Sequence, residues 1–231
     1  MLMDCVFELK KSQIPQHKKI ILGYAPHFLD TQSLIFSPIP LQTTQQINYE
    51  VGTEEGVMLL LAHQLCTQPS AKLQEIFSQI DLGYLSAESN VGEEELEEVL
   101  EFIQDEGFSL ILTQDFLTHP KSENILALFE EISKESNIQC LLDSLSPSPC
   151  SSLPEYNGSV VRITQGELQL RGSKQFALFA KTQNGAMASI THPNFSLQAP
   201  FVLDEEMRGT IAILQIPNPL PSYPYQKVQI K

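Results

Sequence analysis

Tryptophan is absent from the 231-residue sequence, and the aromatic residues, at 8%, form no stripe interleaved with bases. Proteins that bind single-stranded nucleic acids use such aromatic platforms in basic grooves. Bases are also scarce, because 14 Lys and Arg stand against 28 Asp and Glu, for a formal net charge of −14. A nucleic acid is therefore excluded as the expected partner, and a free anionic membrane surface is disfavoured.

Cysteine is equally sparse. The four cysteines have neither CxxC nor CxH spacing, and they are Cys5, Cys66, Cys140 and Cys150. This spacing predicts neither a zinc site nor an iron–sulfur cluster. Two of the four lie inside apolar segments, where a reduced thiol packs as a small hydrophobe. We expect four reduced cysteines and no bound metal.

Long hydrophobic runs are missing too. No stretch of 18 uncharged apolar residues occurs, and residues 1–10 carry an early acid and no basic segment of the signal-peptide type. The expected protein is cytoplasmic and does not insert directly into a membrane.

The common catalytic and cofactor motifs are also absent. The sequence contains no Walker A motif, no GxGxxG after a strand, no HExxH and no GxSxG. We therefore expect no cofactor and no catalytic centre of the usual kinds.

The most regular part of the sequence begins at Gly92. Glu93, Glu94 and Glu95 follow it, at a position where the free amide groups of a helix start favour carboxylates. A helix is predicted up to Gly107, and its buried face is expected to comprise Leu96, Val99, Leu100 and Ile103.

Two strands and a second helix are predicted next. The strands are 108–113 and 138–142, and a loop at 114–120 separates the first from a helix capped by Ser122. The buried stripe of this helix is expected to be Ile125, Leu128, Phe129 and Ile132. Strand, helix and strand in this order form a right-handed crossover, so the fold class is α/β with a Rossmann-like, doubly wound parallel sheet.

Further elements precede this unit. A first strand is predicted within 17–25, a core helix at 54–65 after the cap Thr53, and a shorter helix from Ser70 to Ile80. The core helix is apolar nearly all round, so it is expected to have contacts on two sides and to bury His63. The residues from 28 to 49 show no clear period.

The domain organisation follows from a change in composition. Residues 16–144 are predicted as the α/β domain and 145–157 as a linker rich in Pro and Ser. Residues 158–231 are predicted as a small, β-rich, barrel-like module with one helical turn at 173–180. Its tail, from Pro217 onwards, is expected to be extended, to form no regular ladder and to cross a surface.

Candidate site residues lie where parallel strands end. Asp115 and His119 follow a central strand, at the edge where open α/β sheets bind ligands, and His119 with the nearby acid could serve as a general base. Gly23 and Gln114 are the candidates for contact with a cofactor. Because no nucleophile motif accompanies them, the favoured interpretation of Asp115 and His119 is stabilisation of their loop.

Several segments resemble one protein family in the order in which they occur. The segments are Val51–Ala62, Gly92–Glu98, Leu110–Ile125, Leu168–Ala177 and Met207–Ile213. They are similar to the molybdopterin-oxidoreductase-type domain and C-terminal β module of the large peripheral-arm subunit of NADH–quinone oxidoreductase, respiratory complex I. The iron–sulfur clusters of that subunit lie in a cysteine-rich N-terminal region that this sequence lacks, so the chain resembles the distal half.

The resemblance implies a non-catalytic structural and assembly role. The implied partners are the other subunits of a complex I-like peripheral arm, and the implied location is cytoplasmic, held at the inner membrane through the complex. The alternative function is that of a small oxidoreductase or transferase, with a pterin or nucleotide bound at the edge of the sheet near Gly23 and Asp115.

Overall fold

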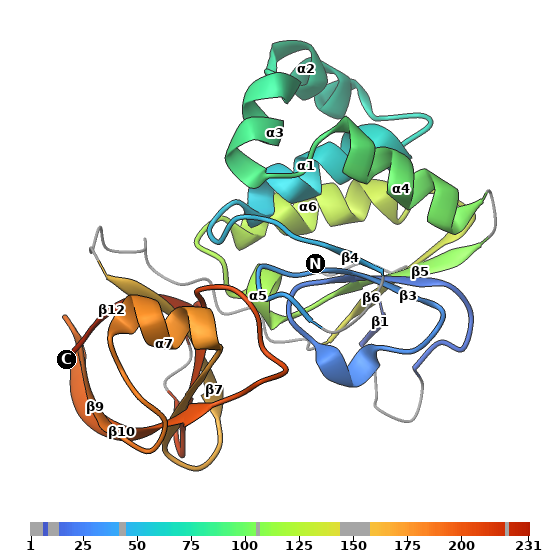
Figure 1. Ribbon diagram of the computed structural model, residues 1–231. Coiled ribbons are helices and arrows are strands. Elements are labelled where there is room, and N and C mark those ends of the chain that lie inside the picture. Colours follow the sequence, from blue (N-terminus) through green and yellow to red (C-terminus); the bar gives the residue numbers. More distant parts are fainter. Residues whose placement is uncertain (1–6, 9–13, 42–44, 105–106, 144–157, 220–221) are drawn as a thin grey trace. The chain divides into compact units, whose positions relative to one another are not determined.

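The computed structural model of the chain is shown in Figure 1, and it describes residues 7–8, 14–41, 45–104, 107–143, 158–219 and 222–231. The chain divides into two compact units. The first contains Met1–Pro38 and Gln45–Pro149, and the second contains Ile39–Thr44 and Cys150–Lys231. The linker predicted at residues 145–157 lies outside the described residues.

A parallel sheet forms the centre of the first unit. Within the described residues it has six strands in the order β1-β6-β5-β2-β3-β4, all paired in parallel. The chain runs from β2 outward to β4 and then returns to β5 on the other side of β2, so the order reverses between β2 and β5. The strands are β1 (Phe7–Glu8), β2 (Lys19–Leu22), β3 (Ser33–Phe36), β4 (Gln46–Ile47), β5 (Phe108–Leu112) and β6 (Ile138–Leu142).

Helices cover one face of this sheet. Ile20 and Leu22 of β2 and Leu110 and Leu112 of β5 point into the core that the helices complete, and Figure 1 shows α1, α4 and α6 together on that side. Helix α1 packs against both α3 and α6, as its apolar circumference predicts. The helices are η2 (Pro26–Phe28, a 3-10 helix), α1 (Glu54–Leu65), α2 (Ala71–Gln79), α3 (Leu82–Ser89), α4 (Glu93–Ile103), α5 (Gln114–Leu117) and α6 (Ser122–Ile132).

The start of α4 is as predicted, but its buried face and its end differ. The Glu95 carboxylate accepts a hydrogen bond of 2.8 Å from the Gly92 N–H, which fixes the first turn. Leu100, predicted to be buried, is 40% exposed, and Phe102 packs against the core. The helix ends at Ile103 and not at Gly107, because Gln104 adopts a left-handed conformation with φ 49°.

The segment after β5 also differs in part from the prediction. Residues 114–120 were expected to form a loop, but they begin with the single turn α5. Ser122 was expected to cap the next helix, whereas Lys121 is the cap residue and Ser122 is the buried first residue of α6. The backbone N–H of Ser122 donates a hydrogen bond to the His119 carbonyl. The predicted stripe of α6 is confirmed, because all four of its members are buried.

A buried base lies in β2. Lys19 is fully buried, and its Nζ donates to the Pro15 carbonyl at 2.9 Å and to Asp30 Oδ2 at 2.7 Å. Burial raises the pKa of Asp30, but hydrogen bonds from Lys19, Ser33 and the Gln32 N–H outweigh this effect and hold the pKa below its ordinary value. This ion pair fastens the segment after η2 to the sheet.

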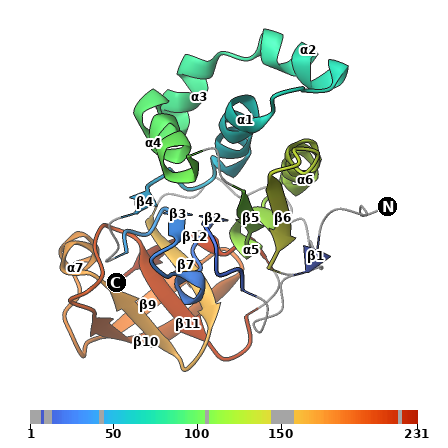
Figure 2. The ribbon, with the colours of Figure 1, turned by 90° about the vertical axis from the view of Figure 1, so that its right-hand side faces the viewer.

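The second unit is a closed β-barrel, seen in Figure 2. Its described residues provide six strands in the order β10-β8-β11-β7-β12-β9, with α7 (Lys174–Ala180) beside them. Ser173 caps α7 by accepting a hydrogen bond from the Phe176 N–H at 3.0 Å. The strands are β7 (Ser159–Gln165), β8 (Gln169–Gly172), β9 (Met187–His192), β10 (Phe195–Leu203), β11 (Ala212–Ile216) and β12 (Tyr225–Ile230).

The structure of the tail contradicts the prediction for it. The residues after Pro224 were expected to be extended and without a ladder, but they form β12, which pairs antiparallel with β7 and β9. Val228 of β12 is fully buried in the barrel core. The prolines all precede the strand, so every N–H of β12 remains available as a donor.

Because β12 closes the barrel, we expect that deletion of residues 217–231 leaves the second unit without a cooperative fold. Hydrogen exchange read on β7 and β9 is the measurement, and fast exchange in both strands is the expected result. Lys227→Ala changes an exposed residue of the same strand and is the control, with slow exchange retained. Slow exchange in the truncated chain would show that the barrel closes without β12.

Candidate functional site

The strongest candidate site lies where the order of the sheet reverses. Leu22 of β2 is paired with Leu112 of β5, so Gly23 and Thr113 come next to each other at the carboxyl ends of these strands. Gln114 and Asp115 follow directly in α5, and His119 follows α5. The structure therefore brings the predicted residues to one edge of the sheet, which is the place where open α/β sheets bind ligands.

Asp115 is bound to the protein itself. Its side chain is fully buried, and Oδ2 accepts a hydrogen bond of 2.8 Å from the backbone N–H of Tyr24. Next to it, Thr113 Oγ1 donates to the Leu22 carbonyl at 2.7 Å. Both contacts join the end of β2 to the end of β5.

Gly23 lies close against the same two residues. Its φ is +107°, and a Cβ atom placed on it would lie 2.0 Å from Thr113 Oγ1 and 2.9 Å from the Asp115 Cβ. The glycine thus serves a close approach of two segments of the chain. At this position Thr113 and Asp115 take up the space that a side chain on residue 23 would need.

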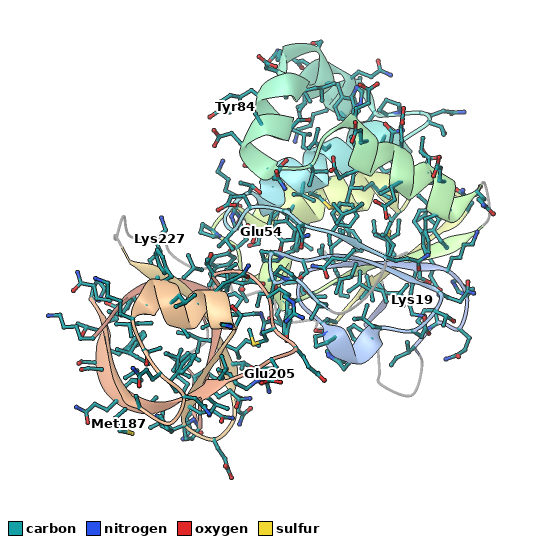
Figure 3. The ribbon with its side chains drawn as sticks, in the orientation of Figure 1. Lys19, Glu54, Tyr84, Met187, Glu205 and Lys227 are labelled. Atoms are coloured by element: carbon teal, nitrogen blue, oxygen red, sulfur yellow. The ribbon has the colours of Figure 1, made fainter. Side chains whose placement is uncertain are left out.

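His119 contacts another part of the first unit, the start of α1. It is almost fully buried, and its Nε2 lies 3.5 Å from Oε2 of Glu54, the buried first residue of α1 (Figure 3). Its Nδ1 accepts a hydrogen bond of 3.1 Å from the Lys121 N–H, which assigns the proton of the neutral ring to Nε2. Burial lowers the pKa of His119, although a backbone hydrogen bond with Gly52 and the charge of Glu55 oppose this shift.

Further contacts join α1 to the start of α6. Glu55 of α1 binds the Lys121 ammonium at 2.5 Å and the Asn124 amide at 2.6 Å. The sequence did not predict Glu54, Glu55, Lys121 or Asn124 as members of this cluster. The sequence did offer one signal for this cluster, which is the pair of carboxylates in the first turn of a core helix. A carboxylate that is buried there needs a hydrogen-bond donor from another part of the chain.

Gln114 contributes mainly through its backbone. Its carbonyl accepts hydrogen bonds from the N–H and the hydroxyl of Thr118, at 3.0 and 2.7 Å, and its side chain is partly exposed. Asp115 accepts a hydrogen bond from the segment after β2, whereas His119 lies against Glu54 of α1, so the two side chains contact different elements. His63, expected in the core, is exposed on α1, and its ring centroid lies 4.9 Å from that of Phe77.

Two cavities lie elsewhere. One, of about 480 Å³, is beside α7 in the second unit, and the other, of about 630 Å³, is at the amino ends of β5 and β6. His17 borders the larger one, and its Nε2 lies 2.8 Å from Ser109 Oγ, a pair that the sequence did not reveal. Ser109 is fully buried and also donates to Gln139, so its hydroxyl is out of reach of a substrate.

The Cys66 thiol is not activated. Burial, together with the neighbouring Glu135 and Glu131, raises the pKa of Cys66 to about 11, so this thiol is protonated at neutral pH. Cys140 is buried and its Sγ lies 3.9 Å from the Phe129 carbonyl. The other two cysteines lie outside the described residues.

The described residues contain neither a cluster of metal ligands nor a membrane-spanning helix. Within them, no three or more His, Cys, Asp or Glu side chains gather as a metal site would require. Among the same residues, none of the helices has the length and apolar character needed to span a bilayer.

Comparison with protein-family models gives no match, and no curated protein matches the sequence either.

Gly23→Ala tests the close packing at the edge of the sheet. We expect it to destabilise the first unit by about 3 kcal/mol or more, because an unfavourable φ and a steric overlap with Thr113 act together. Gly52→Ala is the matched control, since Gly52 has φ +90° and open space around it, and should cost about 1–2 kcal/mol. Chemical denaturation measures both variants, and equal losses would contradict the packing argument.

The lowered pKa of His119 predicts that the first unit loses stability in acid. Its pKa is lowered from 6.5 by folding, so the unfolded chain takes up a proton at a higher pH than the folded chain does. The stability that this group contributes is complete above about pH 6.5 and is lost as the pH falls through the lowered folded pKa. His119→Asn, whose amide oxygen can still accept from Lys121, should lose less stability between about pH 7.5 and about pH 5.5.

The readout for this variant is hydrogen exchange of α1. It is specific to the first unit, whereas His192, whose pKa burial also lowers, lies in the second. An acid-induced loss of protection in α1 that is the same in His119→Asn and in the unchanged chain would show that His119 is not its source.

Proposed function

We propose that this chain is a non-catalytic structural and assembly subunit of a complex I-like NADH–quinone oxidoreductase, or the split-off C-terminal half of the large peripheral-arm subunit of such an enzyme. The order of its two units along the chain supports the proposal. A parallel α/β unit followed by a closed barrel is consistent with the order of modules that the sequence resemblance implies. Many functions share such folds, so the architecture alone does not carry the proposal.

The main support for the proposed structural role comes from the contacts between β2 and β5, where the strand order of the sheet reverses. Gly23, Thr113 and Asp115 fill the space between β2 and β5, and their polar atoms are bonded to the chain itself. The residues at the position where such a sheet would bind a ligand are thus engaged in holding the unit together. A role in assembly uses this rigidity, whereas catalysis would need some of these groups to face a substrate.

The same packing counts against the alternative. A pterin or nucleotide held by Gly23 and Gln114 would have to approach the backbone where Thr113 and Asp115 already lie. The favoured partners are therefore other subunits of the peripheral arm, which would hold the chain at the cytoplasmic side of the inner membrane through the complex.

Co-purification tests the proposal. The full chain, tagged and expressed in its native host, should be recovered with peripheral-arm subunits of NADH–quinone oxidoreductase, identified by mass spectrometry. The purified chain alone should show no absorbance of a pterin, flavin or nucleotide bound one to one. Recovery without any of those subunits, or a stoichiometric organic cofactor, would overturn it.

A further inference from the structure

Helix α7 of the barrel unit carries two adjacent apolar side chains in solvent. Leu178 is 73% exposed and Phe179 is 61% exposed, although the same helix buries Phe176 completely. Burying a large apolar side chain is worth about 1.5–3 kcal/mol, so a partner that covers this adjacent pair would gain binding free energy from both side chains.

Bases border this apolar pair. Lys174 and Gln175 are exposed one turn before Leu178 and Phe179, and Lys181 is exposed at the end of the helix. The segment from 174 to 181 contains no acid, in a chain whose net charge is −14. We define Lys174, Gln175, Leu178, Phe179 and Lys181 as the α7 face.

A cavity of about 480 Å³ continues the α7 face. Lys174 and Gln175 line it on the helix, and Leu203, Met207 and Arg208 line it on the segment after β10. Asp204 and Glu205 also border it, and Asp204 forms an ion pair of 2.7 Å with Arg171, so the bases Lys174 and Arg208 outnumber the one remaining carboxylate, Glu205. The Arg208 guanidinium donates to the Glu205 and Met207 carbonyls, contacts that hold it in place without neutralising its charge. The cavity can therefore receive a side chain that is in part anionic.

We propose that the α7 face and this cavity form a docking surface for a protein partner that presents an apolar pocket bordered by carboxylates. The apolar pocket covers Leu178 and Phe179, and the carboxylates meet Lys174, Lys181 and Arg208. The inference rests on the proposed assembly function, and it names the surface and the chemistry through which that function operates.

Charge favours a protein partner of this kind over two other occupants. An anionic bilayer is recruited by clusters of four to eight bases, whereas α7 has two lysines and the chain as a whole is strongly acidic. A second copy related by a twofold axis would bring the same face against itself, and that face has no carboxylate to meet Lys174 and Lys181. A carboxylate-bordered pocket satisfies both the apolar and the charged members of the face.

The double variant Leu178→Glu with Phe179→Glu tests this surface in the full chain. We expect the fraction retained with its partner complex in the native host to fall at least about tenfold, since two apolar anchors are lost and acids oppose carboxylates. Met187→Glu is the matched control, because Met187 is 60% exposed but lies on β9 (Figure 3), and it should leave retention unchanged. Thermal unfolding equal to that of the unchanged chain shows that the variants fold.

A photo-crosslinking residue at position 179 identifies the occupant. The expected product joins position 179 to a segment of another protein that contains both apolar and acidic residues, and the same probe at position 187 should give no such product. Crosslinks to lipid, to a second copy or to the chain's own first unit would overturn the proposal, as would full retention of the double variant.

The two proposals fail separately. If the crosslinked protein has the stated chemistry but belongs to no respiratory complex, the docking surface stands and the proposed function falls. If the chain is recovered with the peripheral arm but retention does not depend on Leu178 and Phe179, the function stands and the docking surface falls.

Discussion

The first unit depends on how closely β2 and β5 approach at their carboxyl ends. Gly23 has no side chain, so Thr113 and Asp115 can close over it and bond to the backbone at Leu22 and Tyr24. This contact joins the two halves of the sheet at the point where its order reverses. The helices that follow β5 take their positions from it, because α5 begins at Gln114 and α6 follows from Lys121.

The long, periodic segments could be predicted from the sequence. Helix α1, strands β5 and β6 and the stripe of α6 follow from apolar spacing that any compact fold must bury. Short elements could not be predicted in this way. Strand β4 has two residues and α5 has four, which is about one period of the pattern that would identify each, and a pattern shows only when it repeats. Leu100 was misplaced because Phe102 competes for the same core.

The candidate site shows the same division. The position of Gly23, Asp115 and His119 at one edge follows from a rule about parallel sheets, and it could be stated from the sequence. Their partners could not, because Tyr24 and Asp115 are 91 residues apart and nothing local marks them as a pair. Whether an acid binds a ligand or a neighbouring backbone depends on such distant contacts, and so does the assignment of a role.

The closing strand of the barrel has a consequence for synthesis. Strand β7 pairs with β11 and β12, and β9 pairs with β12. One edge of β7 and one edge of β9 therefore stay without their β12 partner until residues up to Ile230 have been added. While the ribosome is still adding those residues, β7 and β9 expose unpaired amides and carbonyls, which are the groups through which nascent chains aggregate. The α/β unit can fold during translation, whereas the barrel stays open to such contacts until β12 has been made and can pair with β7 and β9.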